Sequence, residues 1–322
     1  MEKEVLPVAK PSQEVSLELV SQAQDYIRQA KAKNTLKAYQ TDWRHFQAWC
    51  AAKQLASLPA APETVVLYLT ELASKAKTST IQRRISSLSQ AHQAAGLESP
   101  TKSAPVKAVW QGIRRAKGIA NEGKAPILTE DIRVMIGAIR KGTLLSVRDR
   151  ALLLLGFAGA FRRSELVALD VEDLSFPREG LVIALKRSKT DQEGRGEKKG
   201  IPYGSHPDTC PVRALRDYLE RSGISSGPLF RSVNRHGRLS SSRLSDKAVA
   251  LIVKRSAEAA GLDPAIYSGH SLRAGLATQA SMAGVSERAI MAQTGHKSTA
   301  VMRRYIRDGN LFRENAAASI GL

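Results

Sequence analysis

Apolar residues recur at helical spacing through the first third of the chain, and no alternating, strand-like stretch interrupts them. An apolar stripe predicts a helix over about residues 15–30, and a second helix begins near Asn34 or Thr35, either of which can cap it. Three further helices are predicted over residues 63–74, 78–95 and 104–117. We therefore expect residues 15–117 to form a compact all-helical domain behind a flexible N-terminus, residues 1–14.

The pattern changes beyond the fifth helix. Glycine, proline and charged residues dominate residues 118–126, which predicts an interdomain linker. Residues 146–158 are apolar nearly all round, as in a buried helix, and residues 180–203 contain two short strand-like runs joined by a long basic turn. With the helical patterns around them, these segments predict a second, mixed α/β domain over residues 127–322. The predicted fold class is mainly α with a small antiparallel sheet.

The charge of the chain indicates what kind of partner it binds. The 322 residues include 49 Lys and Arg against 30 Asp and Glu, a net charge of +19. Residues 1–120 hold 17 basic and 9 acidic residues, and the remainder holds 32 and 21, so both halves are basic. Two basic domains are expected of a protein that binds a polyanion such as DNA. A soluble protein that is basic without such a partner remains the alternative.

Several classes of protein are disfavoured by what the sequence lacks. No apolar run is long enough to span a membrane and no signal-peptide core follows Met1, so we expect a cytoplasmic protein with no membrane partner. Cys50 and Cys210 are far apart, and the six histidines form no pair at metal-binding spacing. A disulfide framework, a metal enzyme and a P-loop enzyme are therefore not expected, and we predict no cofactor.

Candidate chemistry is concentrated between residues 268 and 305. His270 and Arg273 are three residues apart, a spacing that places both on one face of a helix. His296 follows a Thr-Gly turn, and Tyr305 ends the series. A proton acceptor, a fixed cation and a phenol are the groups that phosphoryl transfer without a metal requires. Each also has a plainer interpretation, because a single Tyr or His at apolar spacing is more often part of a core.

Four motifs follow one another along the second domain: AFRRSELVAL (160–169), RSKT (187–190), GHSLRAG (269–275) and TGHKSTAVMRRYIR (294–307). Together they resemble the tyrosine recombinase (phage integrase) family, and the helical spacing of the first domain is similar to that of Cre- and Xer-like members. The resemblance implies an N-terminal SAM-like core-binding domain and a C-terminal catalytic domain. It also implies a catalytic set made of Arg162, Glu165, Lys189, His270, Arg273, His296 and the nucleophile Tyr305. Arg163 is the competing candidate for the first arginine, and Ala160 stands where the family usually has glycine.

The family's chemistry gives each group a role. A tyrosine attacks a DNA phosphate and forms a 3′-phosphotyrosine, which keeps the energy of the phosphodiester bond, so rejoining needs neither ATP nor a metal. The resemblance implies that His270 accepts the proton of Tyr305 and that Lys189 protonates the departing 5′ oxygen. His296 would bind the phosphate or support Tyr305, and the two arginines would neutralise the charge that grows on the phosphate.

The resemblance also implies partners. These are double-stranded DNA and further copies of the chain, as a homo-oligomer, a tetramer on two paired sites, each built on a short inverted repeat. The short segment before the first predicted helix favours a recombinase without an extra arm-binding domain, and residues 311–320 are predicted to dock on a neighbouring protomer. A type IB topoisomerase or telomere resolvase, and a non-catalytic DNA-binding protein of the same fold, remain alternatives. The sequence leaves open the target site and whether a second recombinase takes part.

Base-reading residues are expected near the start of the helix over residues 78–95. Short polar and basic side chains at a helix N-terminus suit the major groove of DNA. The candidates are Thr80, Gln82, Arg83 and Arg84, with Lys247 in the second domain. A solvated helix face explains any one of them equally well.

Overall fold

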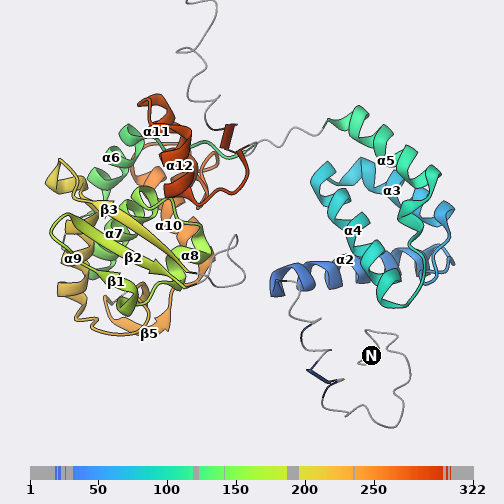
Figure 1. Ribbon diagram of the computed structural model, residues 1–322, viewed down its shortest axis with the longest axis horizontal. Coiled ribbons are helices and arrows are strands. Elements are labelled where there is room, and N and C mark those ends of the chain that lie inside the picture. Colours follow the sequence, from blue (N-terminus) through green and yellow to red (C-terminus); the bar gives the residue numbers. More distant parts are fainter. Residues whose placement is uncertain are drawn as a thin grey trace, which may run out of the picture. The chain divides into compact units, whose positions relative to one another are not determined.

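The computed structural model of the chain divides into two compact units, Met1–Glu122 and Gly123–Leu322 (Figure 1). The residues that the structure describes are 32–118, 123–140, 142–186, 196–234 and 236–299, with residues 19, 21, 22, 26, 302, 303 and 305. Most of the helix predicted over residues 15–30, the basic turn with Lys189, and the segment 311–320 lie outside them. Within the described part, no helix is long and apolar enough to cross a membrane.

The first unit is helical, as the apolar spacing predicts. Its helices are α2 (Lys33–Ala52), α3 (Pro62–Lys75), α4 (Thr78–Ala94), the short 3-10 turn η1 (Pro100–Lys102) and α5 (Ala104–Lys117). The proline that opens α3 costs nothing there, because the first N–H of a helix has no partner within the helix. Aromatic rings fill the centre of the unit, and the Phe46 and Tyr68 rings meet edge to face with their centroids 4.9 Å apart.

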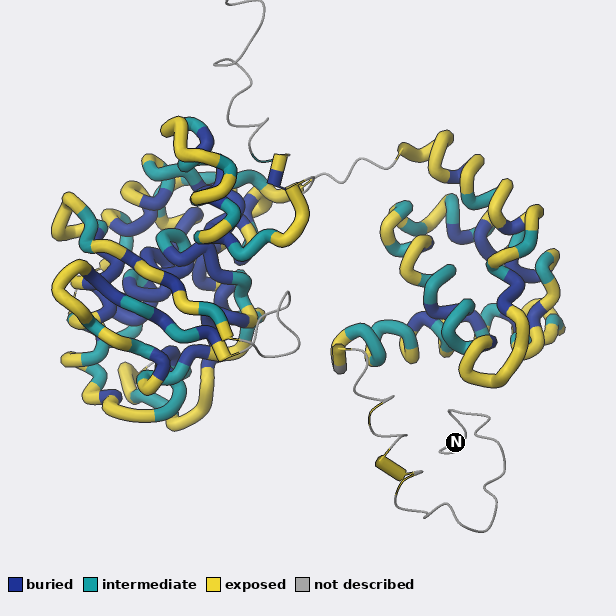
Figure 2. The backbone as a smooth tube through the Cα atoms, viewed as in Figure 1, coloured by how far each residue is buried: buried dark blue, intermediate teal, exposed yellow. Residues whose placement is uncertain are grey.

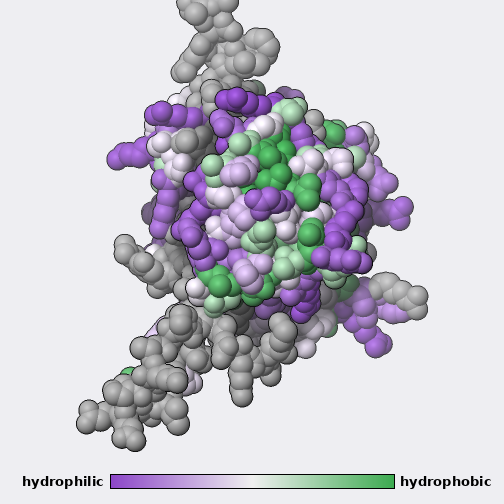
Figure 3. All heavy atoms as spheres, turned by 90° about the vertical axis from the view of Figure 1, so that its right-hand side faces the viewer, coloured by the Kyte–Doolittle hydropathy of each residue, from purple (hydrophilic) through white to green (hydrophobic). Residues whose placement is uncertain are grey.

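Apolar side chains also reach the surface of this unit. Leu58 and Leu67 are exposed. The face of the molecule drawn in Figure 3 shows apolar side chains (green) within a mostly hydrophilic surround (purple). Single exposed apolar residues are ordinary on a soluble surface.

The second unit is built around α7 (Leu144–Ala158), which is buried over most of its length, as its all-round apolar sequence predicts. The helices that surround it are α6 (Thr129–Ala138), α9 (Pro211–Ser222), α10 (Asp246–Ala259) and α11 (Ser271–Met282). Figure 2 shows the resulting layer of buried backbone (dark blue) through the middle of the unit. Shorter elements complete it: α8 (Arg163–Ala168), η2 (Val171–Asp173), η3 (Pro207–Thr209) and α12 (Glu287–Thr294).

A small antiparallel sheet covers one side of these helices. It consists of β1 (Leu174–Ser175), β2 (Gly180–Leu185) and β3 (Glu197–Pro202), with β2 in the middle. Gly180 pairs with Pro202 and Leu185 with Glu197, so β2 and β3 form the predicted hairpin. A second antiparallel pair joins β4 (Arg231–Val233) to β5 (Leu239–Arg243). The mainly helical fold with small antiparallel sheets is confirmed.

The position of α11 is set by an unusually close backbone contact. Ile127 N donates to Ser271 O at 3.0 Å, which holds the segment before α6 against the first turn of α11. Gly275 lies one turn further along, where a Cβ atom would come within 1.8 Å of Ile127 O. Only glycine therefore allows α11 to lie this close to the core, and α11 carries Arg273.

Candidate active site and DNA-binding helix

The turn between α7 and α8 positions the first arginine. Ala160 has a φ of +48°, the left-handed conformation that explains why glycine is usual at this point of the motif. Arg162 follows, and the buried carboxylate of Glu165 accepts hydrogen bonds from its backbone N at 2.9 Å and from its Nη1 at 2.5 Å. Arg163 instead lies beside Gly269, with its guanidinium 3.8 Å from Asp246. The structure thus favours Arg162 over Arg163 as the site arginine.

Arg273 projects from α11 toward the same turn. Its side chain is 1% exposed, and Nη1 donates to Ala160 O at 2.9 Å. Burial, and after it the charge of Arg162, lower the pKa of this guanidinium to about 10, so it stays positive at neutral pH. Its Nη2 is buried without a hydrogen-bond partner among the described residues. A buried, charged donor without a partner suits a phosphate oxygen.

His270 and Tyr305 meet directly, although 35 residues separate them. His270 stands at the N-terminal end of α11, and its Nε2 lies 2.8 Å from Tyr305 Oη. Tyr305 packs on Ala277, Ile290 and Met302. The phenol is thus held by its ring while its oxygen points at an imidazole nitrogen, which is the geometry that proton transfer requires.

His296 also lies beside the tyrosine ring, with the ring centroids 5.9 Å apart. It follows Gly295, which ends α12 in the left-handed conformation. Thr294 Oγ1 donates its proton to Ile290 O at 2.7 Å, so it accepts from Nδ1 of His296 at 2.8 Å, and Nε2 is the unprotonated nitrogen. Burial, followed by the charges of Arg273 and Arg162, lowers the pKa of His296 to about 4. Its imidazole is therefore neutral at pH 7.

Six of the seven catalytic residues expected from the sequence are described, and all six lie in this cluster. Lys189 falls outside the described residues. The cluster also holds a buried lysine that the sequence reasoning missed, Lys199 on β3. The period-2 alternation of a strand places Lys199 on the same inward face as Ile201, and that signal was available in the sequence.

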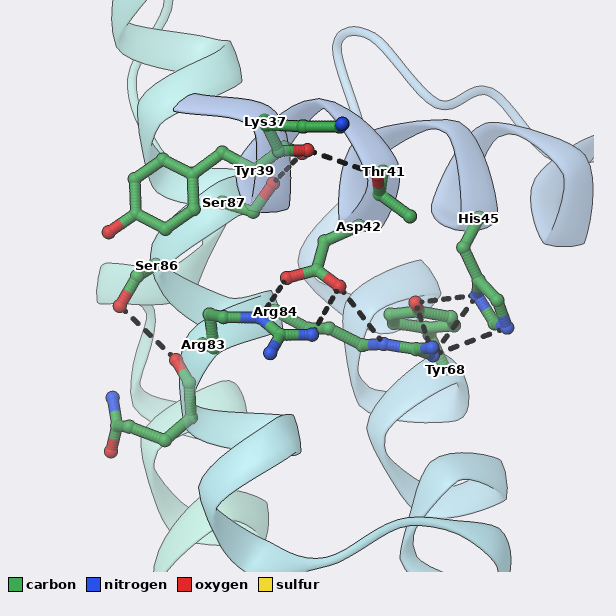
Figure 4. Close-up of polar contacts among 11 residues, drawn as sticks. Lys37, Tyr39, Thr41, Asp42, His45, Tyr68, Arg83, Arg84, Ser86 and Ser87 are labelled. Carbon is green, nitrogen blue, oxygen red and sulfur yellow. Dashed lines mark hydrogen bonds and ion pairs between the residues drawn. The ribbon is translucent and has the colours of Figure 1, made fainter. Parts of the chain in front are cut away.

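The candidate DNA-reading residues on α4 divide into two groups (Figure 4). Gln82 and Arg83 are exposed, and Arg83 donates from Nε and Nη2 to the buried carboxylate of Asp42, at 2.7 and 3.0 Å. Arg84 turns inward, with Nη1 3.1 Å from Tyr68 Oη, and its side chain is only 15% exposed.

Arg84 thus joins helices of the first unit, and its role in reading DNA stays a prediction. Thr80 is half-buried at the start of α4, and Lys247 is exposed in the first turn of α10.

Comparison with known proteins agrees with this geometry. Residues 127–310 match the phage integrase family, and residues 22–98 match the N-terminal SAM-like domain of phage integrases. An integrase/recombinase xerD homolog of Selenomonas ruminantium is 45% identical over 293 residues, which cover 90% of this chain and 86% of that protein. Recombinase cre of Escherichia phage P1 is 28% identical over 97% of this chain and 94% of its own length.

Solved structures show the same fold. XerH recombinase bound to a palindromic difH substrate matches with a TM-score of 0.61 and 17% identity over 81% of this chain and 72% of that one. A lambda integrase dimer bound to a COC′ core site matches with a TM-score of 0.59 and 18% identity over 94% of this chain and 79% of that one. With a family match over more than half of its length and a close relative over nine-tenths of it, the chain belongs to the phage integrase family of tyrosine recombinases.

Proposed function

We propose that this protein is a site-specific DNA recombinase that cleaves and rejoins DNA through a 3′-phosphotyrosine on Tyr305. The observation that carries the proposal is the 2.8 Å contact of Tyr305 Oη with His270 Nε2, in a cluster that also holds two partly or fully buried arginines. A phenol beside a proton acceptor and next to fixed positive charge is an activated nucleophile for an anionic ester.

The position of Tyr305 beside His270 supports the following reaction, in which the family resemblance gives Lys189 its role. Tyr305 Oη attacks the scissile phosphorus, its proton passes to His270, and the bond to the 5′ oxygen breaks. Lys189 protonates that oxygen as it leaves. A free 5′ hydroxyl from a second strand then attacks the phosphotyrosine, and the phenol leaves with its proton restored, so the products again contain only phosphodiester bonds. Neither a metal nor ATP is consumed in these steps.

The two arginines supply most of the electrostatic stabilisation of the transition state. Arg162 and Arg273 hold the non-bridging oxygens of the phosphate, whose negative charge increases as the tyrosine attacks. Glu165 keeps the Arg162 guanidinium in one orientation and offsets part of its repulsion with Arg273. A bound phosphate offsets the cationic charges that help to lower the pKa of His296, so we expect this imidazole to gain a proton more readily in the complex and to donate to the phosphate.

The remaining expectations concern the whole assembly. We propose that residues 15–117 form the core-binding domain and residues 127–322 form the catalytic domain. Residues 118–126 link the two domains, and residues 1–14 precede the first domain as a flexible segment. The net charge of +19 supports double-stranded DNA as the partner. The proposed DNA contacts are Thr80, Gln82, Arg83, Arg84 and Lys247. The family resemblance implies a tetramer on two paired inverted-repeat sites, and we propose that this assembly works in the cytoplasm.

The proposal is tested with a suicide substrate, a duplex nicked near the cleavage point, drawn from DNA that flanks the gene. Wild-type protein in EDTA should form a covalent complex, and Tyr305→Phe should bind the same duplex without forming one. Specific binding without a covalent complex in the wild type would indicate a non-catalytic DNA-binding protein. Relaxation of a supercoiled plasmid that lacks the site would indicate a type IB topoisomerase instead.

A further inference from the structure

Lys199 is a buried cation that the proposed reaction does not use. Its side chain is on the inward face of β3, and the residue is 3% exposed. Nζ donates to Gly159 O at 2.9 Å and to Gln293 O at 2.5 Å, and it lies 5.1 Å from the centroid of the Phe161 ring. No carboxylate of the described residues is within salt-bridge distance of this ammonium.

Burying the Lys199 ammonium lowers the stability of the folded protein. An ammonium loses several kcal/mol of hydration when it is buried, and carbonyl oxygens with an aromatic ring compensate only in part. Burial accordingly lowers the pKa of Lys199 to about 8. A methionine would fill the same space without this cost. A buried charge that lowers stability, placed beside an active site, indicates a functional role.

The two carbonyl partners of Lys199 belong to the two segments that carry the reacting groups. Gly159 lies in the turn before Arg162, next to Ala160, whose carbonyl holds Arg273. Gln293 lies in the last turn of α12, three residues before His296 and in the segment that leads to Tyr305. The Gln293 side chain adds a second connection, since its Nε2 donates to Ala158 O at 2.8 Å.

We propose that Lys199 is a positioning residue for strand cleavage, whose ammonium joins the Arg162 turn to the end of α12 and supplies a fixed positive charge behind the two arginines. This inference rests on the proposed recombinase function. Because Lys199 is enclosed, it holds the site residues in position from inside the protein and does not touch the DNA. Its role therefore differs from that of Lys189, which acts on the leaving oxygen.

After burial, four charged groups around Lys199 affect its protonation. Glu165 on α8 and Glu197 on β3 favour the protonated form, whereas Arg273 on α11 and Arg162 before α8 oppose it. His296, beyond α12, is itself affected by the Lys199 charge. With its pKa near 8, Lys199 is positive at pH 7 and loses its charge as the pH rises toward 9.5.

The test compares Lys199→Met with wild type, and Lys198→Met serves as the matched control because Lys198 is exposed on the same strand. Single-turnover cleavage of the suicide substrate is measured from pH 6.5 to 9.5, with binding of intact duplex measured in parallel. At pH 7 we expect Lys199→Met to cleave about 100-fold more slowly, because a displacement of reacting groups by about 1 Å costs that much rate. Duplex binding should be unchanged, and the control should match wild type.

The pH dependence separates this role from simple packing. The ratio of wild-type to Lys199→Met rates should fall toward one by pH 9.5, because wild type then loses the same charge. A constant ratio across this range, an unchanged rate at pH 7, or a parallel loss of duplex binding would overturn the proposal. If Lys199→Met does not fold, Lys199→Arg replaces it: the guanidinium stays charged, so the wild-type to Arg ratio must fall between pH 7 and 9.5, and a flat ratio overturns the proposal.

The failure of this inference is distinct from the failure of the proposed function. A wild-type protein that forms the covalent complex, with a Lys199→Met variant equally fast, rejects only the role of Lys199. A wild-type protein that forms no covalent complex on a specifically bound duplex rejects recombination, and the proposed role of Lys199 with it.

Discussion

Gly275→Ala should damage both stability and cleavage through a single added methyl group. The new Cβ would lie 1.8 Å from Ile127 O, whereas real Cβ contacts are essentially never under 3.0 Å, so α11 or residue 127 must move by about 1.2 Å or more. The contact is with backbone, which cannot rotate away as a side chain would. The movement also strains the hydrogen bond from Ile127 N to Ser271 O and displaces Arg273, two residues before the substitution.

The expected size follows from two opposing terms. Overpacking lowers the free energy of unfolding by about 3 kcal/mol, whereas replacing a helical glycine with alanine raises it by about 1 kcal/mol. The net loss of stability is about 2 kcal/mol. For a unit of this size the loss corresponds to a fall of about 4–8 °C in Tm. Displacement of Arg273 by about 1 Å should slow cleavage about 100-fold, since misplaced groups of this kind lose that much rate.

Gly137→Ala is the matched control for this prediction. Gly137 is also a helical glycine of the second unit, in α6, and a Cβ there would meet nothing within 4 Å. This variant should gain about 1 kcal/mol and cleave as wild type does. The two variants are compared by thermal unfolding followed by circular dichroism and by formation of the covalent complex. If Gly275→Ala behaves like Gly137→Ala in both measurements, the close packing of α11 is not what positions Arg273.

Two further predictions concern Arg84 and His296. Arg84→Met should lower the stability of the first unit by about 2 kcal/mol in urea unfolding, because it removes inward contacts to Tyr68 and Asp42. Arg83→Met should also lose stability, because it removes a bidentate pair with the buried Asp42, but it should in addition weaken DNA binding and flatten its salt dependence. Wild-type DNA binding by Arg83→Met would contradict its proposed contact. His296 has a pKa of about 4 in the folded protein against an ordinary value of 6.5, so the stability it contributes is present above pH 6.5 and is lost as the pH falls toward 4. Urea unfolding of wild type should therefore lose more stability between pH 7 and 4.5 than that of His296→Asn, and parallel losses would argue against a neutral, buried imidazole.

Local pattern was sufficient for much of the fold. The helices of the first unit follow from apolar residues at a 3.6-residue period, and α7 follows from a run that is apolar on all sides. These patterns are contained within each segment, so they predict the helices without any knowledge of tertiary contacts. The β2–β3 hairpin was predicted for the same reason, since two short strand-like runs lie close in sequence on either side of a basic turn.

The parts that could not be predicted depend on contacts between distant segments. Arg83 and Arg84 are neighbours in sequence, and only contacts with distant residues separate them: Arg83 pairs with Asp42 from an exposed position, whereas Arg84 turns inward to Tyr68. Ile127 restricts Gly275 through a contact across 148 residues, which no local pattern indicates. Lys199 is intermediate, because strand alternation predicts that it faces inward but not that it meets the ends of α7 and α12.

If Tyr305 is the nucleophile, it becomes covalently attached to DNA, and the site of that attachment can be measured. The complex trapped on a suicide substrate is digested with protease and nuclease, and the modified peptide is sequenced by mass spectrometry. We expect a 3′-phosphonucleotide on the Tyr305 oxygen, absent from the Tyr305→Phe protein. A nucleotide on any other residue, or a covalent complex that persists in Tyr305→Phe, would contradict it.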